Sequence, residues 1–414
     1  MSYFTSIQYN DSGSLDAFSR LRTSSPEAIF AVQSQYDTTP IQMEGGATGT
    51  GVAPLWNSST RMVALTCTAG TGVSYYQSYQ YNPYQPGKSQ FIAMTGVIGT
   101  GVAGHVLDMG YGDSLNGIFL RQNGASGLQM VQRSSTSGSV VNTAIDQANW
   151  NIDKLNGTGP SGITLDVTKA QILIIDLQFL GMGRVRVGFD IDGVVYYAHQ
   201  FLNANSLSVP YMQSATLPIS MTLTSTTSAA PKTFYFKCAT VISEGGILQE
   251  YGITSSTPSV AVTATNAART VAMSVRPKTT FGGVPNRSFF LLENISIFVT
   301  GNMDVYWELV TGAVITAQTW ADVNTANSAF EYTSVPGVFG NLTNGQVLAS
   351  GYCSRLGGTN NGTMIDINSI TSINNPIALN RAGAVTNNGT LTLLVQGLSA
   401  NSAMQSNIGF REIR

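Results

Sequence analysis

Apolar residues in this sequence recur at every second position, and hardly anywhere at the spacing of a helix. Within residues 184–191, apolar side chains alternate with polar side chains or glycine; the apolar members are Val185, Val187, Phe189 and Ile191. A period of two places such side chains on one face of a β-strand. No stretch of ten or more residues combines good helix formers with a period of 3.6. The sequence therefore predicts an all-β protein.

Short turns between the alternating segments predict β-hairpins. Asp192-Gly193 separates residues 184–191 from a second β-rich run, 194–201. Both central residues of a type I′ turn need a positive φ, which Asp-Gly tolerates. A similar pair of runs flanks residues 123–127. Four more alternating segments lie at residues 233–242, 304–310, 390–395 and 408–413. Many short antiparallel strands are typical of β-sandwiches of the jelly-roll or lectin-like type.

The length of 414 residues indicates more than one domain. A strand-like segment runs into Glu244-Gly-Gly and is followed by a Ser/Thr/Pro-rich stretch at residues 253–259. We therefore predict two β-sandwiches behind an extended N-terminal arm. The predicted parts are residues 1–24 for the arm, 25–246 for the first sandwich and 247–414 for the second.

The arm has apolar residues but is too short to form a core. Its ordering entropy would be offset by burial against a neighbouring subunit. One or two helical turns at residues 14–22 are as plausible as an extended chain. We predict that the arm packs on the neighbour and that its arginines pair with acidic groups there. The candidate arm contacts are Phe4, Phe18, Arg20, Leu21 and Arg22.

The surface implied by this composition is polar but carries few charges. Asp, Glu, Lys and Arg make up 10% of the residues and the net charge is -2, whereas a typical soluble domain has ~25% charged residues. No basic stripe is visible, which argues against nucleic acid as a partner. Weak electrostatic repulsion favours self-association. We predict a symmetric homo-oligomer or a part of a larger lattice, with a trimer as the first guess.

Histidine and cysteine are too sparse for a metal centre. The histidines are His105 and His199, and the cysteines Cys67, Cys238 and Cys353 lie far apart. This spacing fits neither a zinc site nor a disulfide framework. We expect no metal, no cofactor and no internal disulfide.

The N-terminal residues lack the basic start and apolar run of a secretion signal. The most apolar stretch, residues 170–180, contains Asp176 and is too short to cross a bilayer. We expect no signal peptide and no membrane insertion.

Several short motifs match enzyme signatures but lack the required context. Residues 112–115 spell Gly-Asp-Ser-Leu, yet neither histidine follows an Asp at the spacing of that hydrolase family, and no helix follows. The Gly-rich residues 99–104 precede no helical segment that could hold a pyrophosphate. Gly87-Lys88-Ser89 lacks the first glycine of a phosphate-binding loop. Asp190 and Asp192 fit a hairpin turn better than a calcium loop. We therefore predict that the protein is not an enzyme.

Tyrosines are concentrated at residues 75–84. Tyrosine offers a large contact area at low entropy cost and is favoured at recognition surfaces. We interpret the cluster as packing, either between subunits or on the sandwich itself, and we favour subunit packing over glycan contact, which is the alternative. Its members are Tyr75, Tyr76, Tyr79, Tyr81 and Tyr84. For His199, which the period of two places on one face with Val195, Tyr197 and Phe201, we favour a core or interface position over a general base.

Several blocks of the sequence resemble a family of virion structural proteins of tailed bacteriophages, especially marine ones. The first is DAFSRLRTSSPEAIFAVQSQYDTTP at residues 16–40. The next blocks, in the same order as in the family, lie at residues 81–99, 116–124, 150–205 and 239–246. The similarity covers about residues 14–246 and continues more weakly to the end. It implies a structural component of a virus particle, made in the host cytoplasm, without catalysis. The family supplies no functional residues to carry over.

Three functions follow as hypotheses. The first is a structural virion protein that assembles with itself and with other virion proteins in a tail, baseplate, fibre or capsid. The second is a receptor-binding, lectin-like module that recognises host-surface glycans. The third is a glycan hydrolase, which needs two carboxylates ~5–10 Å apart; Asp108 and Asp113, which we expect in loops, are examples of candidates.

Overall fold

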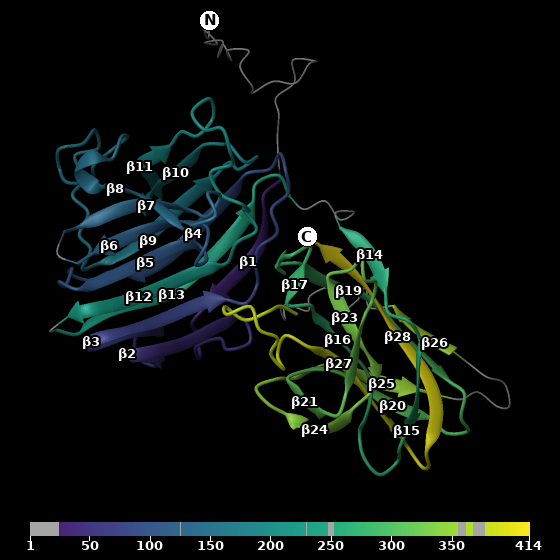
Figure 1. The fold of residues 1–414 in the computed structure, drawn as a ribbon. Helices are drawn as coiled ribbons and strands as arrows, with labels where there is room; N and C mark the ends of the chain where they lie inside the picture. The colour runs from purple at the N-terminus through teal and green to yellow at the C-terminus, as the bar shows by residue number, and fades with distance from the viewer. Residues whose placement is uncertain (1–24, 125, 229, 247–251, 355–361, 367–376) are drawn as a thin grey trace, which may run out of the picture.

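The computed structural model describes residues 25–124, 126–228, 230–246, 252–354, 362–366 and 377–414. The predicted arm and its five contact residues lie outside these ranges. The chain is all-β with antiparallel sheets (Figure 1). The helical content of the described residues is one 3-10 turn at Gln147–Asn149. In the same residues no helix has the length and apolar character needed to cross a membrane.

Residues 27–243 form one antiparallel sheet of 13 strands. Its main path runs β11-β10-β9-β4-β13-β3-β12-β5-β6-β7-β8, while β1 pairs with β13 and β2 pairs with β3. The strands are β1 (Glu27–Gln33), β2 (Met43–Asn57), β3 (Met62–Ser78), β4 (Gln90–Val97), β5 (His105–Gly112), β6 (Gly117–Asn123), β7 (Leu128–Ser134), β8 (Val141–Asp146), β9 (Ala170–Leu177), β10 (Val185–Ile191), β11 (Val194–Phe201), β12 (Ile219–Ser228) and β13 (Lys232–Ser243).

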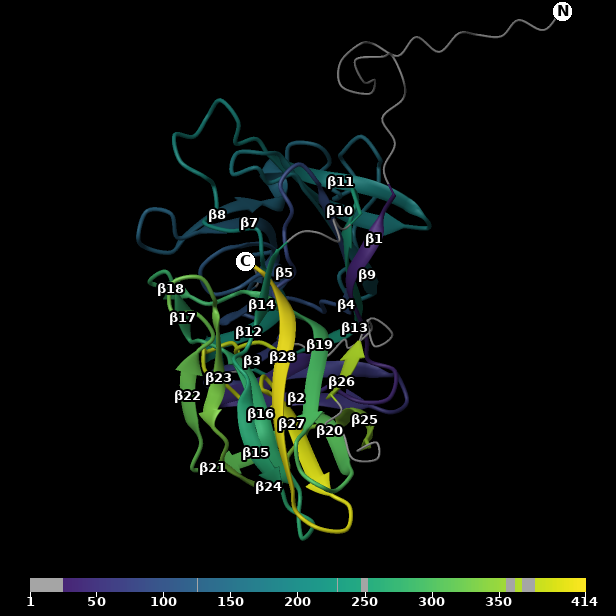
Figure 2. The same cartoon turned by 90° about the vertical axis from the view of Figure 1, so that its right-hand side faces the viewer.

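This sheet curls around a single hydrophobic core, so that it acts as both layers of a sandwich (Figures 1 and 2). Alternate residues of β9, such as Leu173 and Ile175, are buried in the core. The segment after β8 reaches the far end of the path: the amides of Ile152 and Asp153 donate to the carbonyl of Ala198 on β11, at 3.1 and 3.0 Å. The curl therefore brings the two ends of the sheet together.

The hairpin predicted at Asp192-Gly193 is confirmed. The two residues have φ values of 55° and 82°, and Ile191 faces Val194 in the register of β10 and β11. Positive φ at both positions is the geometry of a type I′ turn. The second predicted hairpin is the antiparallel pair of β6 and β7.

The predicted face of His199 is wrong in part. Val187 faces His199, but the next residue of β10, Gly188, faces Tyr197, so Ala198 forms a β-bulge. A bulge adds one residue to a strand and reverses the alternation on either side of it. His199 and Phe201 therefore face inward, whereas Tyr197 and Val195 lie on the outer face.

Residues 253–413 form two further sheets around a second core (Figure 1). One has the order β14-β28-β19-β26, with β15 also on β28, and the other β22-β23-β16-β27-β20-β25. Their strands are β14 (Ile253–Ser256), β15 (Val260–Ala264), β16 (Thr270–Pro277), β19 (Phe289–Val299), β20 (Val305–Thr311), β22 (Thr319–Asp322), β23 (Phe330–Val335), β25 (Val347–Cys353), β26 (Gly362–Asp366), β27 (Leu391–Gly397) and β28 (Ser402–Ile413). Two short ribbons pair β17 (Thr280–Phe281) with β18 (Val284–Pro285) and β21 (Ala313–Thr316) with β24 (Val338–Leu342).

We call the parts with these separate cores the first and second domains. The cysteines Cys67, Cys238 and Cys353, all within the described residues, form no disulfide.

Candidate functional site

The first domain carries a polar groove with a volume of about 380 Å³ on its outer face. Strands β4, β9, β10 and β11 provide its floor, and the segments before β4, between β9 and β10 and after β13 provide its rim. Its floor residues include Phe91, Asp176, Arg186 and Tyr197, and its rim residues include Lys88, Ser89, Arg184 and Glu244.

Strand pairing sets the floor of the groove. Phe91 on β4 faces Asp176 on β9, and Asp176 in turn faces Arg186 on β10. Residues opposite one another in adjacent strands point to the same face of the sheet. Their neighbours Ile92 and Ile175 are fully buried in the core. An aromatic ring, a carboxylate and a guanidinium thus lie in one row on the outside.

Hydrogen bonds hold the polar floor in place. The Asp176 carboxylate accepts from the Arg186 guanidinium and, at 3.1 Å, from the Tyr197 hydroxyl. The Arg186 guanidinium also lies 4.2 Å from the centre of the Tyr197 ring. Burial, followed by the nearby Asp176 carboxylate, raises the pKa of Tyr197 to about 12. Asp176, Arg186 and Tyr197 each contact the other two. Because these contacts fix their side chains, the floor of the groove is rigid before any ligand binds.

Three rim segments are tied together. The Ser89 hydroxyl donates to the Glu244 carboxylate at 2.5 Å, and the Lys88 ammonium donates to the carbonyl of Gly246 at 2.8 Å. The amide of Leu180 donates to the Tyr84 hydroxyl at 3.0 Å. Leu180 itself is 60% exposed at the rim. The groove therefore has a fixed outline as well as a fixed floor.

The tyrosine cluster divides between the core and the junction of the two domains. Tyr76 and Tyr84 belong to the first core. Tyr76 is fully buried, whereas Tyr84 keeps a small exposed surface that lines the groove. Tyr81 is 5% exposed, and its ring lies 4.2 Å from the Arg287 guanidinium of the second domain. Tyr75 and Tyr79 are half-buried.

Two arginines of the second domain meet the first domain at this junction. The Arg381 guanidinium lies 4.4 Å from the centre of the Tyr75 ring, and the amide of Arg381 donates to the Glu44 carboxylate at 2.6 Å. The Arg287 guanidinium likewise packs over the Tyr81 ring. Figure 1 shows the loop that precedes β27 reaching toward β2 and β3. Tyr75 and Tyr81 thus serve a contact within the chain, between its domains.

The carboxylates named as hydrolase candidates are engaged in structural contacts. Asp108 lies on β5, not in a loop as we predicted, and it is buried together with its strand neighbours Leu107 and Met109. It pairs with Arg121 at 2.6 Å and with Arg133 at 2.8 Å. Asp113 does lie in the turn between β5 and β6, where its carboxylate accepts from the amides of Leu115 and Asn116.

The other enzyme-like motifs also occupy structural positions. Ser114 follows Asp113 in the same turn, and β6 rather than a helix comes next. Residues 99–104 connect β4 to β5. His199 packs edge-on against Phe201, accepts the amide of Asn151 at its Nδ1 atom, and has a pKa lowered by burial. No group of metal-ligating side chains occurs within the described ranges.

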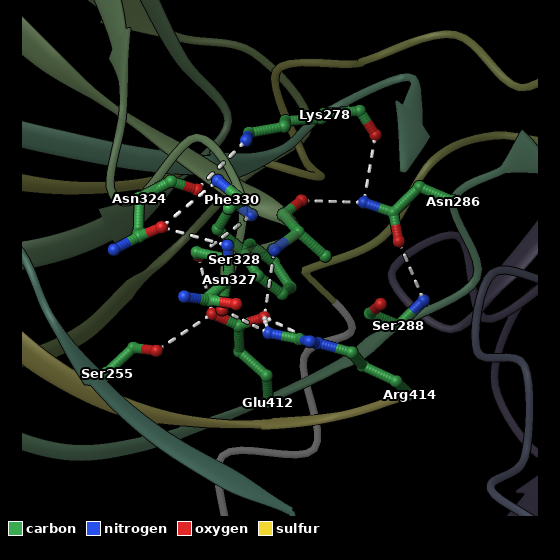
Figure 3. A network of polar contacts seen from close by, with 12 residues as sticks. Ser255, Lys278, Asn286, Ser288, Asn324, Asn327, Ser328, Phe330, Glu412 and Arg414 are labelled. Carbon is green, nitrogen blue, oxygen red and sulfur yellow. Dashed lines mark hydrogen bonds and ion pairs between the residues drawn. The ribbon is translucent and has the colours of Figure 1, made fainter. Parts of the chain in front are cut away.

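A second polar cluster surrounds Glu412 in the second domain (Figure 3). The Glu412 side chain is fully buried, and its carboxylate accepts from the hydroxyls of Ser255 and Ser328 at 2.9 and 2.5 Å. The amide of Ala329 donates at 2.9 Å, and the Arg414 guanidinium pairs with it at 3.1 Å. Since both carboxylate oxygens are satisfied, this cluster holds the loop before β23 against β14 and β28.

Sequence reasoning did not identify the groove, although its residues lie in segments that we had singled out. Lys88 and Ser89 belong to the motif discounted as a phosphate-binding loop. Arg184 and Arg186 sit in the first alternating run, where two arginines close together are unusual in a chain with 10% charged residues. That local excess of charge was the available signal.

No protein-family model and no curated protein matches the sequence. Solved structures similar to this chain include the CBM2 module of the evolved Dit of Lactobacillus casei BL23 phage J-1, with 7% identity, 55% of this chain and 100% of that chain covered, and a TM-score of 0.31. The lectin UEA-II, complexed with galactose, has 8% identity, coverage of 53% and 100%, and a TM-score of 0.34. A family 16 glycosyl hydrolase protein from Mycobacterium smegmatis has 11% identity, coverage of 52% and 100%, and a TM-score of 0.33. Similarities this low assign no ligand or activity to this chain.

Proposed function

We propose that the protein is a non-catalytic structural component of a tailed-phage particle whose first domain binds a saccharide in the groove at Asp176. The virion role rests on the resemblance of residues 16–40 and the later blocks to phage structural proteins. The saccharide role rests on one observation, the row of Phe91, Asp176 and Arg186 beside Tyr197.

This row suits the chemistry of a sugar ring. A pyranose has an apolar C–H face that packs on an aromatic ring, and a rim of hydroxyls that both donate and accept hydrogen bonds. Phe91 and Tyr197 supply rings, while Asp176 and Arg186 supply an acceptor and a donor in fixed positions. The volume of about 380 Å³ lies in the range of small-ligand sites.

A glycan array with the full-length protein tests the saccharide role. We expect binding to a subset of glycans, weakened ~10-fold or more in Phe91→Ala, since one lost ring contact is worth about 1.5 kcal/mol. Tyr36→Ala, which removes a tyrosine that is 78% exposed elsewhere in the same domain, is the control and should bind as the wild type does. Absence of binding to every glycan, or equal binding by Phe91→Ala, would refute the proposal.

Antibody labelling of intact phage particles tests the virion role. Label at a defined part of the particle is the expected result. Particles that carry none of this protein would contradict the virion role.

The predicted homo-oligomer and the arm contacts are tested by light scattering after deletion of residues 1–24. The deletion should weaken assembly and leave both domains folded.

A further inference from the structure

We infer that the groove selects saccharides that carry an anionic group, a carboxylate or a sulfate. This inference rests on the proposed saccharide-binding function and adds the chemical class of the ligand. It follows from the charges around the groove and from which of them already have partners.

Positive charge is in excess at the groove. Its lining has three cations, Lys88, Arg184 and Arg186, and two carboxylates, Asp176 and Glu244. The chain as a whole has a net charge of -2. The net charge of the groove lining is therefore opposite in sign to the net charge of the chain.

Each carboxylate is already engaged by a neighbour. Asp176 is paired with Arg186 and also accepts from Tyr197. Glu244, on the rim, accepts from the neutral Ser89 hydroxyl and keeps its charge. The floor of the groove thus has little negative charge to offer against an acidic ligand.

Two of the cations, in contrast, pair with no carboxylate in the part of the chain that the structure describes. Lys88 donates to the neutral carbonyl of Gly246. Arg184 is exposed, and its guanidinium has no ion-pair partner among the described residues. A guanidinium is a planar fork of donors that matches a carboxylate or a sulfate with two parallel hydrogen bonds. Arg184 and Lys88 therefore fit an anionic substituent on a sugar whose ring lies over the aromatic floor.

Matched pairs of saccharides test this inference by calorimetry with the full-length protein. One pair is trigalacturonic acid and its neutral methyl ester. The other is an agar-type tetrasaccharide with and without sulfate esters. We expect the charged member of at least one pair to bind ~10-fold more tightly, a difference of about 1.4 kcal/mol, and its affinity to fall as salt rises. Which pair shows the preference distinguishes carboxylate from sulfate.

Variants locate the source of the preference. Arg184→Gln and Lys88→Met should each weaken binding of the charged member several-fold more than binding of the neutral member, and so reduce the preference. Lys169→Met makes the same change in charge at an exposed site outside the groove and should change neither. Equal affinities within both pairs, with saccharide binding intact, would overturn the inference alone. No binding to these four or to any glycan of the array would overturn the proposed function with it.

Discussion

The buried Lys232 gives the first domain a specific dependence of stability on pH. Its side chain is 5% exposed, and its ammonium donates to the carbonyls of Ile98 and Thr100 at 3.0 and 2.9 Å. These carbonyls are neutral acceptors. Burial lowers the pKa of Lys232 from 10.5 to about 8. A lysine with this environment is costly to keep charged in the folded state.

The sign of this pH dependence follows from the number of protons that Lys232 binds in the folded and unfolded states. Below pH 8 both folded and unfolded states hold the proton, and the full cost of burying the charge is present. Between pH 8 and 10.5 the unfolded state holds more protons, so stability rises with pH. The lowered pKa corresponds to about 3 kcal/mol in total, since one pKa unit is worth about 1.4 kcal/mol. About 2 kcal/mol of this is recovered between pH 7.5 and 10.

Other groups act in the opposite direction in this range. Burial raises the pKa of the Cys67 thiol above 9.0, and burial raises the pKa of Tyr76 to about 12. A raised pKa of this kind lowers stability as pH rises past the value of the unfolded state. The comparison must therefore be made between wild type and Lys232→Met, which share these groups.

Urea unfolding of the full-length protein at pH 7.5, 8.5, 9.5 and 10 measures the effect. Relative to Lys232→Met, the free energy of unfolding of the wild-type first domain should rise by about 2 kcal/mol from the lowest to the highest pH. For an m-value of ~3 kcal/mol/M, this rise shifts the urea midpoint by about 0.7 M. Lys154→Met, at an exposed site, should follow the wild type. A constant difference between wild type and Lys232→Met across this range would refute the reasoning. If Lys232→Met does not fold, Lys232→Gln serves as the reference in the same comparison.

Three further predictions concern the turns and contacts of the two domains. Gly193→Val should destabilise the first domain by about 2 kcal/mol in thermal melts, because its φ of 82° is strained for a β-branched residue while no atom crowds the site. Gly193→Asn should lose much less, and an unchanged melting temperature in the valine variant would contradict the account. Glu412→Gln should destabilise the second domain by about 2–4 kcal/mol, because an amide cannot accept from all the donors around it. Glu293→Gln, which breaks a partly exposed pair with Arg411, should cost less than about 1 kcal/mol, and equal losses would argue against a special role for Glu412. The double variant Arg287→Ala with Arg381→Ala should leave the melting of each domain unchanged and broaden the distance distribution in small-angle scattering; an unchanged distribution would mean that other contacts fix the domains.

The strands of this protein could be predicted from sequence because their signals are local. The alternation from Val185 to Ile191 and the Asp192-Gly193 turn contain all the information that a hairpin needs. The face of Tyr197 could not be predicted, because the bulge at Ala198 is set by the close approach of the two strands at Gly188, where a Cβ would lie 2.3 Å from the carbonyl oxygen of Tyr196.

The groove was beyond sequence reasoning for a different physical reason. Phe91 and Asp176 are distant in the chain and become neighbours only through the pairing of β4 with β9. The non-sequential order of the 13-stranded sheet is a property of the whole core. The tyrosines illustrate the same limit, since Tyr76 and Tyr81 have similar local sequences but one packs in the core and the other under an arginine of the second domain.

The curl of the first sheet has a consequence for solubility. A strand at the end of a sheet normally exposes amides and carbonyls that can pair with a strand of another molecule. At β11 the carbonyl of Ala198 and the amide of Gln200 are already occupied by residues 151–153. Copies of the chain crowded together are therefore blocked from joining edge to edge through this part of β11.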